Sequence, residues 1–310
     1  MSSREVIALG TASQVPTRER NHVATLVRLG ESCVLVDCGE GTQRQLLRAG
    51  VRSSQLTALC LTHEHGDHSF GVPGVLQRRR LDGASDPLPV VAPDAAIARL
   101  SLLTDFATNG PDPLHRWVPA ATETSSAPVE VLRLGSWSVQ TAPLLHRVPT
   151  VGYRFVEDDG RRLVPDLLTA AGIAGPEIGR LQRGEQVRGV TLDDVSVARP
   201  GQRVAVVMDT AMCDGALALA QDCDLLVCEA TFLDAEAGLA REHRHLTAGQ
   251  AAEIAVRAGV RRLVLTHFSS RYDTLDGHRQ EAGAIHSDLV VPRDLDVIAV
   301  PARRSADLRP

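Results

Sequence analysis

Three histidines and one aspartate occur within six residues, in the segment THEHGDH (62–68), which directly follows the apolar run LTALCL (56–61). These titratable groups would be costly to bury without a shared partner. The first two histidines are two residues apart, so on an extended segment they point the same way, and the glycine permits a turn that redirects the last two groups. Imidazole and carboxylate at an open site favour zinc, and they also bind manganese or iron. The segment therefore predicts a metal site with the ligands His63, His65, Asp67 and His68.

Three further candidate ligands also lie at the ends of apolar runs. His146 ends SVQTAPLLH, Asp209 ends VAVVMD, and His267 ends RRLVLTH. Each one alone is more often a hydrogen-bonded side chain than a ligand. Together with the first segment they supply seven ligands at strand ends, which in α/β proteins converge on one edge of a sheet. This set predicts a centre for two metal ions, with the two carboxylate oxygens of Asp209 bridging them.

Short apolar, β-branched runs alternate with helical patterns along the chain. The expected strands are 5–9, 23–29, 33–39, 56–63, 90–93, 129–134, 138–146, 151–157, 204–210, 224–231, 262–268 and 295–301. The expected helices are 41–49, 73–80, 94–107, 214–221, 247–258 and 277–287, and Thr247 is the expected N-cap of the fifth. This interleaving predicts one α/β domain over 1–310, with helices packed outside β-sheets.

Composition places the chain among ordinary globular proteins: 44% of its 310 residues are hydrophobic and 23% are charged. The net charge is −5, so a nucleic-acid partner would need a local positive patch. All 33 basic residues are arginines. The six cysteines form no CxxC pair, which indicates reduced, buried thiols. Neither a transmembrane-length apolar run nor a signal peptide is visible, so we expect a soluble, cytoplasmic protein with no membrane partner.

The motifs resemble the metallo-β-lactamase superfamily, whose signature is HxHxDH followed by separate His, Asp and His ligands. Within it, the sequence is most similar to the ribonuclease Z family, and the resemblance runs along nearly the whole chain. Several separate strings match in the right order, which is far more specific than the superfamily signature. The strings are LGTASQVPTRERN (9–21), DCGEGTQRQL (37–46), HEHGDH (63–68), HRVPTVGYRF (146–155), MDT (208–210), CEATF (228–232), RHLTAGQAAEIA (244–255) and LTHFSSRY (265–272).

The resemblance implies an αββα sandwich with two Zn²⁺ per subunit, or Mn²⁺ in their place. One ion would be held by His63, His65, His146 and Asp209, and the other by Asp67, His68, Asp209 and His267. The implied activity is endonucleolytic removal of the 3′ trailer of precursor tRNA, leaving a 3′-hydroxyl on the tRNA and a 5′-phosphate on the trailer. Asp67 would be the proton acceptor, and His245, oriented by Glu229, would protonate the leaving 3′-oxygen. The family also implies a homodimer.

Residues 158–203 are rich in Gly, Arg, Asp and Pro and lack a strong strand pattern, which predicts a long solvated loop or a protruding insertion. Within it, 171–187 resembles the family's flexible arm, an exosite that grips tRNA. The implied RNA-binding residues are Arg180, Arg183 and Arg188, with Arg161 and Arg162 adding positive charge, and Arg18 and Arg20 of the PTRERN loop. Departures from the family are the short Ala174-Gly175-Pro176 run, Cys228, Leu246, and Arg18 in place of Lys.

Three alternatives are open at this point. A dizinc small-molecule phosphodiesterase or arylsulfatase-like hydrolase would have the same metal site but would need neither the arm nor the PTRERN loop. A non-catalytic RNA-binding protein would have a degenerate site, whereas this ligand set is intact. A β-lactamase or thiolester hydrolase would lack the strings at 37–46 and 269–272.

Overall fold

The structure is a computed structural model that describes residues 4–108, 114–122 and 125–303. The chain forms two compact units. The first comprises Met1–Val156 with Arg203–Pro301, and the second comprises Glu157–Gln202 with Ala302–Pro310. The larger unit contains the two sheets and the predicted metal ligands, and the smaller unit contains the segment that resembles the flexible arm.

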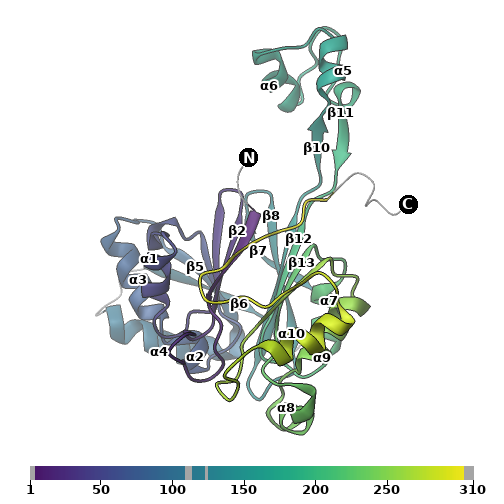
Figure 1. The fold of residues 1–310 in the computed structure, drawn as a ribbon. Coiled ribbons are helices and arrows are strands. Elements are labelled where there is room, and N and C mark those ends of the chain that lie inside the picture. Colours follow the sequence, from purple (N-terminus) through teal and green to yellow (C-terminus); the bar gives the residue numbers. More distant parts are fainter. Residues whose placement is uncertain (1–3, 109–113, 123–124, 304–310) are drawn as a thin grey trace. The chain divides into compact units, whose positions relative to one another are not determined.

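The larger unit is built from two seven-stranded sheets (Figure 1). The first sheet has the order β16-β1-β2-β3-β4-β5-β6, and the second has the order β15-β14-β13-β12-β9-β8-β7. The strands of the first sheet are β1 (Arg4–Gly10), β2 (Ala24–Leu29), β3 (Ser32–Val36), β4 (Ala58–Cys60), β5 (Leu88–Pro93), β6 (His115–Ala120) and β16 (Val297–Ala299). Those of the second are β7 (Val129–Leu134), β8 (Trp137–Leu144), β9 (Thr150–Glu157), β12 (Arg203–Val207), β13 (Leu225–Glu229), β14 (Arg262–Thr266) and β15 (Leu289–Val290).

Alternation along the strands explains why both faces of each sheet are buried. In β1, Val6 and Ala8 belong to the core between the sheets, whereas Ile7 and Leu9 pack toward the helices. A strand presents successive side chains to opposite faces, so an unbroken apolar run covers both. The result is the predicted αββα arrangement, with one helical layer outside each sheet (Figure 1).

The six predicted helices are all present, with ends displaced by at most three residues. Helices α1 (Thr42–Arg48), α3 (Val72–Leu81) and α4 (Ile97–Thr108) lie against the first sheet, and α7 (Asp214–Ala220), α9 (Ala248–Arg257) and α10 (Asp276–Ile285) against the second. Thr247 caps α9 as predicted, because its side chain accepts a hydrogen bond from the Gln250 N–H. Two short helices of this unit, α2 (Gly66–Ser69) and α8 (Ala237–His243), were not predicted: α2 contains the candidate ligands Asp67 and His68, and α8 ends two residues before His245.

The smaller unit has regular structure where the sequence showed no strong strand pattern. Strands β10 (Gly160–Leu163) and β11 (Ser196–Arg199) pair antiparallel, and helices α5 (Pro165–Ala170) and α6 (Pro176–Gln182) lie between them in sequence. A separate apolar cluster holds the unit together. Its buried members are Leu168, Ile173, Leu181, Val187 and Val195. The unit therefore has its own small core rather than being a solvated loop.

Candidate metal centre

Parallel pairing places the candidate ligands at one edge of the second sheet. Strands β12, β13 and β14 run parallel, so the residues that follow them emerge at the same edge. Asp209 follows β12, Glu229 ends β13, and His267 follows β14. The loop after β4 brings the HEHGDH segment from the first sheet, and a bridge between Leu145 and Ala211 fixes the segment that carries His146.

All seven predicted ligands are brought together in two groups. The first group is His63, His65, His146 and Asp209, and the second is Asp67, His68 and His267; within each group the ligand atoms lie within 4.8 Å of one another. Asp209 lies between the groups. Its Oδ2 is 3.6 Å from Nε2 of both His63 and His146, and its Oδ1 is 3.3 Å and 3.2 Å from Nε2 of His68 and His267. This geometry is suited to a bridging carboxylate.

Two buried polar atoms of the ligand groups lack a hydrogen-bond partner, which bears on whether metal ions fit between these residues. Nε2 of His146 and Oδ1 of Asp209 are buried without a hydrogen bond, which is costly unless another group binds them. Nε2 of His63 faces Nδ1 of His65 at 2.8 Å, and Nε2 of His68 faces that of His267 at 3.2 Å. Imidazole nitrogens that face one another in this way are arranged as donors to a shared ion. The residues therefore fit metal ions.

Hydrogen bonds on the far side of the rings orient the histidines. Nδ1 of His63 lies 3.0 Å from Thr62 Oγ1, that of His68 lies 2.7 Å from Asp37 Oδ2, and that of His267 lies 2.9 Å from Thr231 Oγ1. Nδ1 of His146 lies 3.1 Å from the carbonyl oxygen of Arg244. Partners on Nδ1 leave Nε2 directed at the centre, as is usual for metal-ligating histidines.

Carboxylates and imidazoles at the centre shift one another's pKa values. Burial disfavours the charged form of His68, but Asp209, Asp37 and Asp67 outweigh burial and hold its pKa well above the usual value. Burial also raises the pKa of Asp67, but His68 and His267 outweigh burial and hold it well below the usual range. Asp67 is therefore ionised, the form in which a carboxylate can bind a metal ion.

His245 and Glu229, the predicted proton donor and its orienting residue, are in contact. Nδ1 of His245 lies 3.0 Å from Glu229 Oε1, and its Nε2 is 3.9 Å from Asp209 Oδ2. Glu229 is fully buried and accepts hydrogen bonds from the Thr210 N–H and the Thr231 hydroxyl. Burial opposes the charged form of His245, but the carboxylates of Glu229 and Asp209 together raise its pKa to about 9. A protonated imidazole beside the ligands is suited to general-acid chemistry.

Several contacts at the site were not predicted from the sequence. The Gln14 N–H donates to Asp67 Oδ2 at 2.8 Å, and Gln14 has a positive φ of 58°. No sequence signal marks a backbone donor of this kind. Asp37, which binds both Thr62 and His68, falls within the DCGEGTQRQL string, where only the resemblance drew attention to it.

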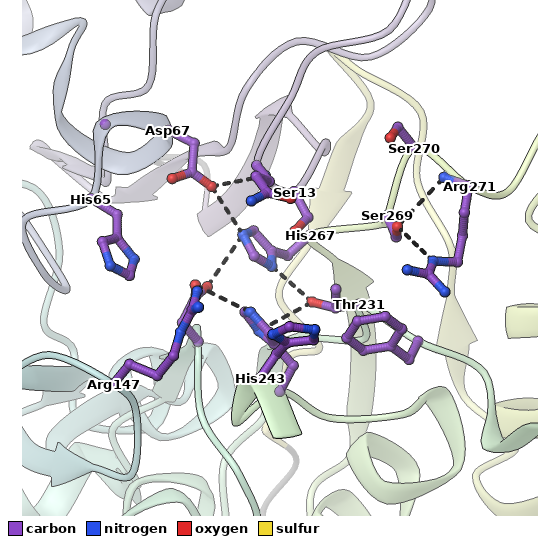
Figure 2. A pocket seen from close by; sticks show the side chains of 15 residues that line it. Ser13, His65, Asp67, Arg147, Thr231, His243, His267, Ser269, Ser270 and Arg271 are labelled. Carbon is purple, nitrogen blue, oxygen red and sulfur yellow. Dashed lines mark hydrogen bonds and ion pairs between the residues drawn. The ribbon is translucent and has the colours of Figure 1, made fainter. Parts of the chain in front are cut away.

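A cavity of about 390 Å³ opens over the two ligand groups. Figure 2 shows His65 and Arg147 on one side and Ser269, Ser270 and Arg271 on the other, with Asp67 and His267 between them. The lining residues are Ser13, Gln14, His65, Gly66, Asp67, Arg147, Asp209, Thr231, Phe232, His243, His245, His267, Ser269, Ser270 and Arg271. This cavity gives a substrate access to both ligand groups and to His245.

Two of the predicted RNA-binding arginines, Arg18 and Arg20, belong to the larger unit that contains this cavity. Arg20 donates to the Tyr272 carbonyl at 2.9 Å, and neither it nor the exposed Arg18 lines the cavity. In the smaller unit, Arg180 and Arg183 pair with Glu185, and Arg188 pairs with Glu177.

Residues 157–202 contain six arginines and eight carboxylates, a net charge of −2. The expectation that the arginines of this segment supply a locally positive charge is therefore wrong, because neighbouring Asp and Glu residues offset them.

Comparisons with known proteins agree with this geometry. Residues 17–126 match the metallo-beta-lactamase superfamily, and residues 177–268 match the beta-lactamase superfamily domain. The chain is 48% identical to the ribonuclease Z of Streptomyces avermitilis, covering 98% of this chain and 100% of that one. It is 37% identical to that of Chlamydia trachomatis, covering 92% and 93%. The crystal structure of human tRNase Z, short form, superposes with a TM-score of 0.69 at 26% identity, covering 96% and 99%.

Among the residues that the structure describes, no helix is both long and apolar enough to span a membrane.

Proposed function

The chain belongs to the ribonuclease Z family of the metallo-β-lactamase superfamily, and from this premise we propose that it is a metal-dependent endoribonuclease that removes the 3′ trailer of precursor tRNA. The observation that carries the proposal is the convergence of seven predicted ligands in two groups that share Asp209. We propose two Zn²⁺ ions per subunit, with Mn²⁺ as a possible substitute. One ion would bind His63, His65, His146 and Asp209, and the other Asp67, His68, Asp209 and His267.

The chain's own residues perform the proton transfers. When bound, the metal ions supply a water nucleophile at neutral pH and positive charge beside the phosphate. Asp67, held by the Gln14 N–H, orients this water and accepts its proton as the water oxygen bonds to phosphorus. The bond from phosphorus to the tRNA 3′-oxygen breaks, and His245 donates a proton to that oxygen. Glu229 holds Nδ1 of His245, so that Nε2 faces the centre.

Comparing two substrates tests this function against its alternative. Purified protein should cut a 3′-extended precursor tRNA at one position beside the acceptor stem, lose the activity with a chelator and regain it with zinc. Bis(p-nitrophenyl) phosphate should be hydrolysed with the same metal dependence. Hydrolysis of the small diester with no cleavage of the precursor would instead indicate the small-molecule phosphodiesterase.

Metal uptake tests the shared role of Asp209. We expect the chelated, dialysed protein to take up two zinc ions per chain, measured by native mass spectrometry. Asp209→Ala should lose binding at both positions, because the carboxylate lies between the two groups. His65→Ala is the matched control, since His65 belongs to the first group alone. Uptake of two ions by Asp209→Ala would exclude a bridging role.

Deleting residues 157–202 should separate chemistry from tRNA recognition. Val156 and Arg203 are antiparallel neighbours, so an Asn-Gly turn can close the hairpin between β9 and β12. The ligands and the three large apolar clusters all lie in the larger unit. We expect hydrolysis of bis(p-nitrophenyl) phosphate within about threefold of wild type and a loss of precursor cleavage of roughly 100-fold, the order of a few kcal/mol of binding. Normal precursor cleavage by the deletion variant would show that this unit is not an exosite for tRNA.

The family resemblance also leads us to propose a cytoplasmic homodimer. Sedimentation at micromolar concentration should give a particle of twice the 33.2 kDa chain mass. A particle of single-chain mass would rule the dimer out.

A further inference from the structure

Arg147 is an exposed cation in the wall of the cavity, directly after the candidate ligand His146. Among the residues that the structure describes, it makes no hydrogen bond and no ion pair. Two other arginines near the cavity are engaged. Arg244 donates to the His146 carbonyl, and Arg271 donates to Ser269 Oγ while its guanidinium lies 4.9 Å from the centre of the Phe232 ring. Of these three arginines, Arg147 is therefore the one whose guanidinium is not already engaged and can bind a ligand.

The backbone around Arg147 is held firmly although its side chain is free. On one side, the Leu145 N–H donates to Thr210 Oγ1 at 3.0 Å, and the Leu145 carbonyl accepts from the Ala211 N–H at 2.9 Å. On the other side, the Val148 carbonyl accepts from Thr150 Oγ1 at 2.9 Å. A fixed backbone lowers the entropic cost when the side chain engages a ligand.

The charges of the cavity indicate what that ligand is. The two carboxylates of the lining, Asp67 and Asp209, belong to the candidate metal groups and are not free to pair with Arg147. A guanidinium binds phosphate through two parallel hydrogen bonds, which makes arginine well suited to an RNA backbone. The exposed side chain of Arg147 contrasts with the buried ring of His267, a candidate ligand that lines the same cavity.

We propose that Arg147 binds the phosphate next to the scissile one in the RNA strand and thereby helps to place the scissile bond over the two metal groups. The inference rests on the proposed function, because an RNA strand has a phosphate next to the scissile one and a small monophosphate diester does not. Bis(p-nitrophenyl) phosphate has one phosphate and cannot use this contact. Arg147 is thus a substrate-binding residue rather than a participant in proton transfer.

The test compares Arg147→Ala with a matched charge-removing control, Arg116→Ala. Arg116 is exposed on β6, which contributes no residue to the cavity. For Arg147→Ala we expect KM for a precursor tRNA to rise about 10- to 100-fold with kcat within about twofold, because one charge-assisted phosphate contact is lost. The slope of log KM against log salt concentration should fall by about 1. Hydrolysis of bis(p-nitrophenyl) phosphate should stay within about twofold, and Arg147→Lys should regain most of the salt slope.

Two results would overturn the proposal while the wild-type protein cuts the precursor normally. One is an unchanged KM and salt slope for Arg147→Ala. The other is an equal loss on both substrates, which would place Arg147 at the reacting phosphate or in the fold itself. Failure of the wild-type protein to cut the precursor would instead reject the proposed function on which the inference rests.

Discussion

Replacing Asp67 with alanine is expected to abolish cleavage of precursor tRNA and hydrolysis of bis(p-nitrophenyl) phosphate alike, each by roughly 10³-fold or more. Both reactions need an attacking water, and Asp67 is the carboxylate that faces His68 and His267 in the second ligand group. Its Oδ2 accepts a hydrogen bond from the Gln14 N–H at 2.8 Å, which holds the carboxylate in place. The measurement is kcat/KM on both substrates.

Glu64→Gln is the matched control for Asp67→Ala. Glu64 lies in the same loop, but its carboxylate pairs with Arg99 and does not line the cavity. We expect the control to keep activity within about threefold, because an ion pair to a largely exposed arginine contributes little. Circular dichroism should show that both variants are folded. If the Asp67→Ala protein still cut at a near wild-type rate, Asp67 would not be the proton acceptor.

Replacing His245 with alanine is expected to affect the two substrates differently. Cleavage of the precursor should fall by about 10² to 10⁴, the usual contribution of a general acid. Hydrolysis of bis(p-nitrophenyl) phosphate should fall by less than about tenfold, because p-nitrophenolate leaves without needing a proton, whereas a sugar 3′-oxygen needs one. Glu229→Gln should produce a smaller loss in the same direction, since Glu229 acts through its contact with Nδ1 of His245.

Metal content distinguishes a proton donor from a ligand at this position. His245 also lies with Asp209 and His267 in a third cluster of potential ligand atoms. If His245 donates a proton, His245→Ala should retain two zinc ions per chain. Equal losses on both substrates together with a loss of zinc would make His245 a metal ligand and would refute its role as general acid.

The positions of the candidate ligands could be predicted from sequence because strand ends carry them. Apolar β-branched runs mark β12 and β14 clearly, and a residue that follows a parallel strand emerges at a known edge of the sheet. The contacts that orient the ligands could not be predicted in this way. The Gln14 N–H and the Arg244 carbonyl are backbone groups of residues with positive φ, and their use depends on loop conformations that no residue type specifies.

In the smaller unit, the strands and helices themselves could not be predicted from the sequence. Its elements are short, with four residues in each of β10 and β11, and only Ser196 among those eight residues is buried, so the two strands show no buried-and-exposed alternation. Its cohesion comes from a cluster of five buried apolar side chains that are widely spaced in sequence. The expectation that the arginines make this segment positively charged was wrong for a related reason. The composition drew attention to the arginines, whereas the carboxylates that pair with them lie elsewhere in the same segment, as Glu185 does for Arg180 and Glu177 for Arg188.

The most direct test of the central claim is the chemistry of the two product ends, mapped after zinc-restored cleavage of a 3′-extended precursor tRNA. Attack by water with departure of the tRNA 3′-oxygen predicts one cut beside the acceptor stem, a 3′-hydroxyl on the tRNA and a 5′-phosphate on the trailer. A 2′,3′-cyclic phosphate on the tRNA would show that the RNA's own 2′-hydroxyl attacks. That result would contradict the roles proposed for Asp67 and the two ligand groups.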